Sequence, residues 1–356
     1  MMHVALRPRM LLIACGVCGC VFNVAAAASN AATARAYVSN EDGESVSVLD
    51  TESNTKIATI DVGKRPRGMK LSHDGSRLFV AVSGLPKCPP SVPDEECAKL
   101  ERDLQADGIA IVDTAKHKVI KLLAAGSDPE QFAMSSDGKR LYVANEDVGT
   151  LSVVDVAAGK VIERIKVGLE PEGVALTPNG RRVLVTNEAG SSVTVIDTET
   201  LQVIKTTPVG QRPRDMDFSP DGDTAYVSGE VDASLNRMSV TGNAPVQRLL
   251  QLREQARPMA VIFDDAHNRL YLSTGRGGTV AVVDMSDAPH SAKLIKEVPV
   301  GKRPWGMALS ADGRYLYTAN GPSNDVSVID TKTLTEVKRI PVGQSPWGIV
   351  LGPVPP

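Results

Sequence analysis

The sequence predicts an all-β protein, a seven-bladed β-propeller in which each blade contains four strands. Three observations predict it: a unit of about 42 residues that recurs along the chain, short apolar strands with alternating character, and turn residues between those strands. A repeat of this length that holds four strands is typical of a propeller blade. A parallel β-helix would need much shorter repeats, and two separate domains would need a break in the period, which the sequence lacks.

The number of blades follows from a proline that precedes an apolar strand. This proline recurs at spacings of 63, 42, 42, 45, 46 and 42 residues. Its copies are Pro66, Pro129, Pro171, Pro213, Pro258, Pro304 and Pro346. Seven copies indicate seven blades, and the single long spacing indicates an insertion at about residues 84–107.

Two further signatures follow each proline. A turn of the type Asp-Gly or Asn-Gly leads into a strand with the pattern Tyr-Val-x-Asn, as in residues 142–145. The next strand ends in aspartate in six units and is degenerate at residues 235–239. The six aspartates are Asp50, Asp113, Asp155, Asp197, Asp284 and Asp330. We expect a structural role for them, as caps of the turn into the fourth strand.

The two ends of the chain predict how the ring closes. The first repeat begins with a second strand at residues 35–39, and the chain ends on a first strand at residues 347–351. We therefore expect the C-terminal strand to complete the N-terminal blade as its innermost strand. This closure removes two free sheet edges that would favour aggregation.

The N-terminus has the features of a secretory signal peptide. Arg7 and Arg9 precede an apolar run at residues 10–24, and four alanines end at Ala28. We expect a signal peptide at residues 1–28, one propeller domain at residues 29–356, a periplasmic location and no membrane span. A lipoprotein anchored at Cys15 is the alternative, but the apolar stretch before that cysteine is short.

The insertion holds the two remaining cysteines of the exported chain, Cys88 and Cys97. Two nearby cysteines in an exported, proline-rich loop predict a disulfide bond. A metal site is the weaker alternative, because no histidine lies near them and the spacing does not fit. No Cys-x-x-Cys-His motif occurs, which excludes c-type haem. The insertion is either a lid over the channel mouth or a surface loop with no role in binding.

The candidate binding residues lie where the innermost strands begin, at one mouth of the central channel. We expect Arg67, Trp305 and Trp347 to be neighbours that lean into the opening, and Glu130 and Glu172 to form an acidic arc opposite. The predicted binding set is Arg67, Glu130, Glu172, Arg214, Trp305, Trp347, Arg65, Arg212 and Arg303. Loops on the same face add Glu41, Glu146, Glu188 and Glu230. These groups form either a pocket for a small molecule or an anionic partner, or solvated ion pairs between blades.

Composition and motifs argue against several functions. A formal net charge of −3 speaks against a dedicated nucleic-acid binder, which usually has a strongly basic face. The four histidines beyond residue 28 occupy unrelated repeat positions, and no Gly-x-Ser-x-Gly elbow occurs. We therefore predict no catalytic residue, no bound cofactor and no metal ligand. The runner-up is a carboxylate-rich mouth that holds Ca²⁺, as in lactone-hydrolysing propellers.

The Tyr-Val-x-Asn strands and the turn Ser219-Pro220-Asp221-Gly222 resemble the YVTN β-propeller repeat family over residues 33–356. Within that family the chain is similar to exported propellers associated with catabolism that depends on pyrroloquinoline quinone (PQQ). The resemblance implies a role in a PQQ-dependent alcohol oxidation or catabolic system. Our leading hypothesis is a non-catalytic periplasmic binding or accessory protein whose channel mouth binds a periplasmic dehydrogenase or a small molecule, and we expect a monomer. The tryptophan-containing repeat of quinoprotein dehydrogenases is absent. The alternatives are a metal-dependent lactonase that uses the mouth carboxylates, and a protein scaffold.

Overall fold

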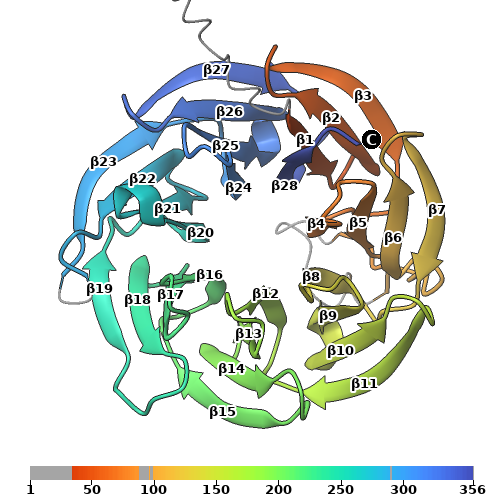
Figure 1. Cartoon of the computed structure of the whole chain (residues 1–356), viewed down its shortest axis with the longest axis horizontal. Coiled ribbons are helices and arrows are strands. Elements are labelled where there is room, and N and C mark those ends of the chain that lie inside the picture. Colours follow the sequence, from red (N-terminus) through yellow and green to blue (C-terminus); the bar gives the residue numbers. More distant parts are fainter. Residues whose placement is uncertain (1–33, 88–95, 97–98, 289–290, 356) are drawn as a thin grey trace, which may run out of the picture. The chain divides into compact units, whose positions relative to one another are not determined.

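The computed structural model describes residues 34–87, 96, 99–288 and 291–355, which belong to one compact unit that spans residues 32–356. In this part of the chain, 28 strands form seven four-stranded antiparallel sheets. The sheets are the blades of a ring around a central channel (Figure 1). The prediction of an all-β, seven-bladed propeller is confirmed. No helix in the described residues is long and apolar enough to cross a membrane.

Every blade runs from an innermost strand at the channel to an outermost strand at the rim. Blade 1 contains β28 (Pro346–Pro353), β1 (Ala34–Asn40), β2 (Ser45–Asp50) and β3 (Thr55–Asp61). Blade 2 contains β4 (Met69–Leu71), β5 (Arg77–Val82), β6 (Gly108–Asp113) and β7 (Lys118–Leu123). Blade 3 contains β8 (Pro129–Met134), β9 (Arg140–Asn145), β10 (Thr150–Asp155) and β11 (Lys160–Lys166). Blade 4 contains β12 (Pro171–Leu176), β13 (Arg182–Asn187), β14 (Ser192–Asp197) and β15 (Val203–Pro208).

The remaining three blades continue around the ring in the same strand order. Blade 5 contains β16 (Pro213–Phe218), β17 (Thr224–Gly229), β18 (Ser234–Ser239) and β19 (Gln247–Gln251). Blade 6 contains β20 (Pro258–Asp264), β21 (Arg269–Thr274), β22 (Thr279–Asp284) and β23 (Lys293–Pro299). Blade 7 contains β24 (Pro304–Leu309), β25 (Tyr315–Asn320), β26 (Asp325–Asp330) and β27 (Thr335–Pro341). Short 3₁₀ helices lie at Glu146–Val148, Asp265–His267 and Gly321–Ser323.

The core lies between the blades. The middle strands are buried on both faces, so their sequences are nearly continuous apolar runs, whereas the outermost strands such as β11 are mostly exposed. Tyr142 and Val153 of blade 3, for example, pack with Val174 and Val185 of blade 4 in one cluster. Each blade therefore depends on its neighbours for most of its buried apolar surface.

The ring closes as the sequence predicts. Strand β28 pairs with β1 in antiparallel register, from Ala34 opposite Pro353 to Asn40 opposite Pro346. The chain's last strand thus becomes the innermost strand of blade 1 (Figure 1). Ile349 of this strand belongs to the apolar cluster that joins blades 1 and 7.

The six repeated aspartates cap turns, as expected. The side chain of Asp50 accepts a hydrogen bond from the Ser53 N–H at 2.8 Å, and that of Asp330 accepts one from the Thr333 N–H at 2.8 Å. The other four aspartates also accept a main-chain N–H two or three residues on: Asp113, Asp155, Asp197 and Asp284. These carboxylates are structural and are therefore not candidates for chemistry.

A second repeated contact joins neighbouring blades at the channel. In four blades, a hydroxyl from the Tyr-Val-x-Asn strand donates to the main-chain carbonyl of the residue that follows the next blade's proline. The contacts are Ser39 to Arg67 (2.7 Å), Thr186 to Arg214 (3.1 Å), Ser228 to Met259 (2.6 Å) and Ser273 to Trp305 (2.6 Å). A Cβ added to Gly173 would lie 2.3 Å from the Arg214 carbonyl oxygen, so only glycine fits there. These contacts fix the backbone from which the mouth side chains project.

Three predictions lie wholly or partly outside the described residues. The signal peptide at residues 1–28 is one, and the disulfide between Cys88 and Cys97 is another. The boundary of the domain at residue 29 also lies there. All three remain predictions.

Removal of β28 should abolish the closed ring. Deletion of residues 345–356 exposes the edge of β1 and removes the buried Trp347 and Ile349. Because truncation of one large buried side chain costs about 2–5 kcal/mol, we expect a loss of at least roughly 5 kcal/mol or failure to fold. Denaturant unfolding monitored by circular dichroism measures this loss. Deletion of residues 354–356, beyond the end of β28, is the control; equal stability of the two truncated proteins would contradict the closure.

Candidate functional site: the channel mouth and the channel

The mouth divides into two regions that differ in charge pairing. Its side chains come from the residues on either side of each repeated proline and from the loops between second and third strands. In blades 2 to 5 the mouth arginines are paired with glutamates or aspartates. In blades 6 and 7 the mouth arginines lack such partners among the described residues. We call these regions the paired sector and the open sector.

Arg67 is the centre of the first ion-pair cluster. Its side chain is 1% exposed, and it donates to Asp128 Oδ1 at 2.6 Å and to the Pro129 carbonyl at 2.9 Å. It also forms an ion pair with Glu130 and lies 3.6 Å from Glu146. One guanidinium therefore faces three carboxyl groups, so the cluster carries an excess of negative charge.

That excess favours a retained proton on the glutamate pair. Burial raises the pKa of Glu130 well above its usual range, and the nearby charges of Glu146 and Glu172 act in the same direction. Burial also raises the pKa of Glu146, and the negative charges of Asp128 and Glu172 act in the same direction. Glu146 is the more exposed of the two. A carboxyl pair that shares a proton can act as an acid and a base, and Glu146 is the member that a ligand can reach.

Arg214 is the centre of the second cluster. It donates to Glu230 Oε2 at 2.7 Å and forms ion pairs with Glu172 and Glu188. Arg212 also pairs with Glu188. Since these contacts join blades 4 and 5, they connect neighbouring blades at the mouth.

The described part of the insertion docks on the same face. Arg65 donates to the Leu85 carbonyl at 2.7 Å and to Glu41 at 3.1 Å, and Lys87 pairs with Asp42 at 2.9 Å. The described residues of the insertion that make these contacts thus lie beside the mouth. Cys88 and Cys97 lie outside the described residues.

The open sector contains three arginines. Arg257 precedes the blade 6 proline, Arg276 lies in the β21–β22 loop, and Arg303 precedes the blade 7 proline. None of these side chains makes a hydrogen bond or ion pair with another described residue. Burial, together with the positive charges of Arg214 and Arg276, lowers the pKa of Arg303. An anion bound here would relieve that repulsion.

The two tryptophans border the open sector but differ in exposure. Their ring centroids lie 5.6 Å apart at 36°. Trp347 is only 6% exposed, whereas Trp305 is partly exposed. The guanidinium of Arg303 lies 4.7 Å and that of Arg214 lies 5.7 Å from the Trp305 ring centroid. Trp305 therefore provides the aromatic surface, and the buried Trp347 ring lies next to it.

The structure brings the predicted binding residues to one mouth, but not all of them are open to a ligand. The expectation that Arg67 and Trp347 lean into the opening is wrong, because both are buried. The predicted residues that are buried are Arg67, Glu130, Glu172 and Trp347, and Arg214 is mostly buried. The accessible ones are Arg65, Arg212, Arg303 and Trp305. Arg65 and Arg212 form ion pairs with glutamates. Of the predicted binding residues, Arg303 and Trp305 are therefore the accessible ones that a ligand can contact without breaking an ion pair.

The predicted set omits Arg257 and Arg276, although the sequence contains a signal for them. In blades 1, 3, 4 and 5 the loop after the second strand begins with a glutamate, whereas blades 6 and 7 have Gly275 and Gly321 at that position. The missing glutamates leave the neighbouring arginines unpaired. An alignment of these loops from the seven repeats would therefore have predicted that blades 6 and 7 contain arginines without acidic partners.

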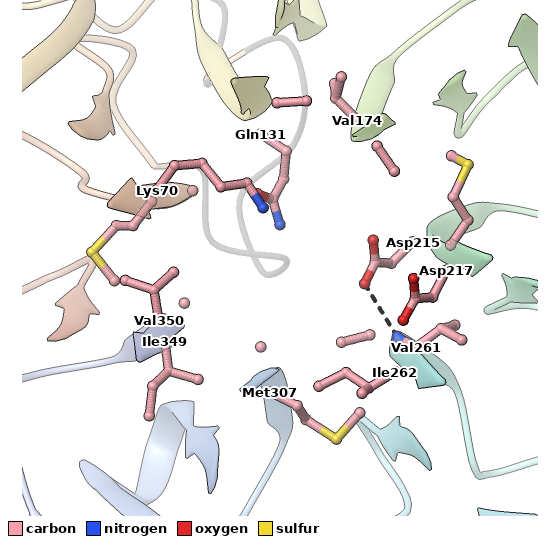
Figure 2. Close-up of a pocket in the computed structure, with 18 of the residues that line it drawn as sticks. Lys70, Gln131, Val174, Asp215, Asp217, Val261, Ile262, Met307, Ile349 and Val350 are labelled. Carbon is pink, nitrogen blue, oxygen red and sulfur yellow. Dashed lines mark hydrogen bonds between the residues drawn. The ribbon is translucent and has the colours of Figure 1, made fainter. Parts of the chain in front are cut away.

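The channel itself holds charges that the predicted set also omits. Alternate residues of the innermost strands line a cavity of about 450 Å³, with Lys70 and Gln131 on one side and Asp215 and Asp217 across from them (Figure 2). Asp215 accepts the Val261 N–H at 3.1 Å, and Asp217 accepts the Phe263 N–H at 2.8 Å. Burial raises the pKa of Asp215 to about 6. Burial likewise raises the pKa of Asp217 and lowers that of Lys70.

The donor groups at the mouth do not fit a metal ion. Among the described residues, no group of three or more histidine, cysteine, aspartate or glutamate side chains could hold one. The mouth carboxylates surround guanidinium groups instead, which occupy the positions a cation would take. The calcium-dependent form of the lactonase hypothesis therefore lacks a ligand set in this part of the chain.

Comparisons with known proteins agree on the fold. The profile described as "Lactonase, 7-bladed beta-propeller" matches residues 198–347, and that described as "Cytochrome D1 heme domain" matches residues 100–252. Each covers less than half of the chain, and together they support a β-propeller without identifying the YVTN group. A search of curated proteins found no match.

Solved structures with low sequence identity share the architecture. A putative 6-phosphogluconolactonase from Bacteroides fragilis has 14% identity and a TM-score of 0.73, covering 91% of this chain and 99% of its own. The periplasmic gluconolactonase of Pseudomonas aeruginosa has 19% identity and a TM-score of 0.67, covering 90% and 99%. Dihydro-heme d1 dehydrogenase NirN has 19% identity and a TM-score of 0.59, covering 86% and 63%. At these identities the likeness establishes the propeller fold alone.

The exposure of the two tryptophans predicts different costs of truncation. Trp347→Ala should destabilise the protein by about 3–5 kcal/mol, as is typical for a buried tryptophan. Trp305→Ala should cost less than about half of that, because its ring is partly exposed. Urea unfolding of both variants beside the unmutated protein measures the two costs. Equal losses would mean that both rings are core residues and that the aromatic surface does not exist.

The buried Asp215 predicts a pH dependence of stability. Since its folded-state pKa of about 6 lies above the unfolded value, the folded state binds more protons, and stability falls as pH rises from about 4 to 7. In Asp215→Asn this fall disappears, while the amide oxygen still accepts the Val261 N–H. The free energy of unfolding of the variant should therefore exceed that of the unmutated protein at pH 7.5, and the difference should shrink at pH 4.5. A difference that is constant with pH would contradict the raised pKa.

Proposed function

We propose that the mouth binds a small sugar-acid anion or the corresponding lactone, and that the protein hydrolyses the lactone. One observation carries the proposal: Arg257, Arg276 and Arg303 have no acidic partner among the described residues, whereas the arginines of the paired sector do. Exposed arginines need no partner for folding. Arg303, however, lies over the partly exposed Trp305 ring, with Arg276 close enough to act on its pKa, and cationic groups beside an aromatic ring match the chemistry of an anionic ligand with a ring.

The open sector accounts for binding. A guanidinium group can donate two parallel hydrogen bonds to a carboxylate or phosphate. The exposed part of the Trp305 ring can contact the C–H face of a sugar ring beside Arg303, whose guanidinium group lies over the same ring. The ligand's charge and its ring would thus be recognised by adjacent side chains.

For hydrolysis, the proposal assigns the acid and the base to the Glu130–Glu146 pair of blade 3, which faces the open sector from the paired side of the mouth. A water oxygen attacks the lactone carbonyl carbon while the ionised carboxylate of the pair takes the water proton. The carbonyl electron pair moves to oxygen, where a mouth guanidinium balances the charge. The tetrahedral intermediate then expels the ring oxygen, which takes a proton from the protonated pair. The product is a hydroxy acid, whose carboxylate suits the same arginines.

The comparisons and the N-terminal sequence add support. Two of the similar propellers are named as lactonases, and one of them as periplasmic. A periplasmic location, the signal peptide, the disulfide Cys88–Cys97, the propeller domain of residues 29–356 and the monomeric state are part of the proposal. The haem d1 relatives suggest no better ligand, since no histidine of the described residues is placed at the mouth.

A second candidate is a non-catalytic accessory protein for PQQ-dependent oxidation, as the YVTN resemblance implies. One observation favours it: three carboxylates of the mouth are held in ion pairs with Arg214 and are not free to act as a base. They are Glu172, Glu188 and Glu230. In this case the open sector binds an anion or an acidic partner without turnover. Kinetics and binding measurements separate the two candidates.

Turnover of D-glucono-δ-lactone, corrected for spontaneous hydrolysis, tests the proposal. Glu146→Gln should lower kcat by about 100-fold or more, because it removes the base. Replacing Arg257, Arg276 and Arg303 together by alanine should raise KM by about tenfold or more. In the unmutated protein kcat should rise with pH as the pair loses its proton.

The control is Arg181→Ala, which removes an exposed arginine from a turn between first and second strands, at the other end of the blades. Its kinetics should match those of the unmutated protein. Absence of turnover together with gluconate binding that depends on the three arginines would favour the accessory protein. Absence of both would refute the anion site.

A further inference from the structure

We infer that the channel is a second binding site, separate from the mouth, for a small zwitterion with one ammonium and one carboxylate group. The inference does not rest on the proposed lactone hydrolysis. It rests on Lys70 and Gln131 on one side of the cavity and on Asp215 and Asp217 across from them (Figure 2).

The fold does not require charge at these positions. Lys70 and Asp217 occupy the fourth residue after the repeated proline in blades 2 and 5, and the other five blades have Ala133, Ala175, Ile262, Ala308 and Val350 there. Asp215 and Gln131 occupy the second residue after the proline, where the other blades have only glycine or alanine. Since small or apolar residues serve in most blades, the polar residues in blades 2, 3 and 5 need another explanation.

The lysine has no direct partner. Among the described residues, the Lys70 ammonium group forms no ion pair and no hydrogen bond, although the charges of Asp215 and Asp217 act on its pKa. Its amine points toward the channel (Figure 2). A partly buried ammonium group that lacks a direct partner would be stabilised by a carboxylate ligand.

The aspartates keep acceptor capacity. Val261 donates one N–H to Asp215, and Phe263 donates one to Asp217 Oδ2. Asp217 Oδ1 also accepts the Phe218 N–H at 2.8 Å. A carboxylate has about four acceptor positions, so Asp217 can still receive an ammonium group.

The opposite charges select for a ligand that carries both. A simple anion attracted by Lys70 would meet two carboxylates in the same cavity, and a simple cation attracted by the aspartates would meet the lysine. A molecule with a carboxylate at one end and an ammonium group at the other satisfies both sides. The cavity volume of about 450 Å³ is sufficient for a small molecule of this kind.

The test is titration calorimetry at pH 7.5 with a series of ω-amino acids from glycine to 6-aminohexanoate. Affinity should pass through a maximum at the chain length that spans the two charged sides. Butyrate and butylamine, which carry one charge each, should bind at least about tenfold more weakly than the best amino acid. Equal affinity for the amino acid and either single-charge analogue would overturn the inference, as would no binding of any member of the series.

Two variants assign the ends of the ligand. Lys70→Met keeps the length of the side chain and removes the charge. Asp217→Asn keeps an acceptor for the Phe263 N–H and removes the charge. Each should weaken binding of the best amino acid by about tenfold or more, with an unchanged circular dichroism spectrum.

Arg303→Ala, at the mouth, is the matched control and should bind the amino acid with unchanged affinity. This control separates the two sites: loss of gluconate binding in Arg303→Ala with retained amino-acid binding supports two independent sites. If Arg303→Ala weakens amino-acid binding as much as Lys70→Met does, the ligand binds at the mouth and the channel site is refuted.

Discussion

The contact between blades at the first residue after each repeated proline determines how this propeller presents side chains. In four blades a serine or threonine hydroxyl donates to the main-chain carbonyl of that residue in the next blade. Glycine at the following position allows the close approach, as at Gly173. Because hydroxyl and carbonyl fix the backbone, the side chain at this position is free to vary. The same register then directs the second and fourth residues after the proline into the channel.

The charged residues around the mouth are paired on one side of the ring and unpaired on the other. In blades 2 to 5, arginine and glutamate from neighbouring blades pair and become buried, as around Arg67 and Arg214. In blades 6 and 7, glycines replace the loop glutamates and leave three arginines without acidic partners among the residues that the structure describes. Burial of an ion pair contributes little net stability but restricts geometry. The paired sector therefore acts as a rigid wall beside an open, cationic sector with an aromatic surface.

Periodicity alone could predict the fold, since spacing of prolines and aspartates depends on backbone geometry that every blade repeats. The closure by β28 and the aspartate caps were predictable for the same reason. Exposure was not predictable, because it depends on neighbours distant in sequence. Trp347 and Trp305 occupy the same repeat position, yet only Trp347 is buried. The pairing of Arg67 with Asp128 likewise depends on the adjacent blade. Lys70 and Asp217 can be found from the sequence, but only when the seven blade repeats are aligned. The alignment shows that the other blades have small or apolar residues at the same position.

The central claim is that the open sector of the mouth is the place where a ligand binds. A crystal structure of the protein with D-gluconate tests it most directly, because it locates the ligand without reliance on turnover. The account predicts a carboxylate within hydrogen-bond distance of Arg303 or Arg276 and a carbon chain against the face of Trp305, with the ion pairs of Arg67 unchanged. Gluconate bound in the paired sector, with those ion pairs broken, or bound only on the outer strands would contradict it.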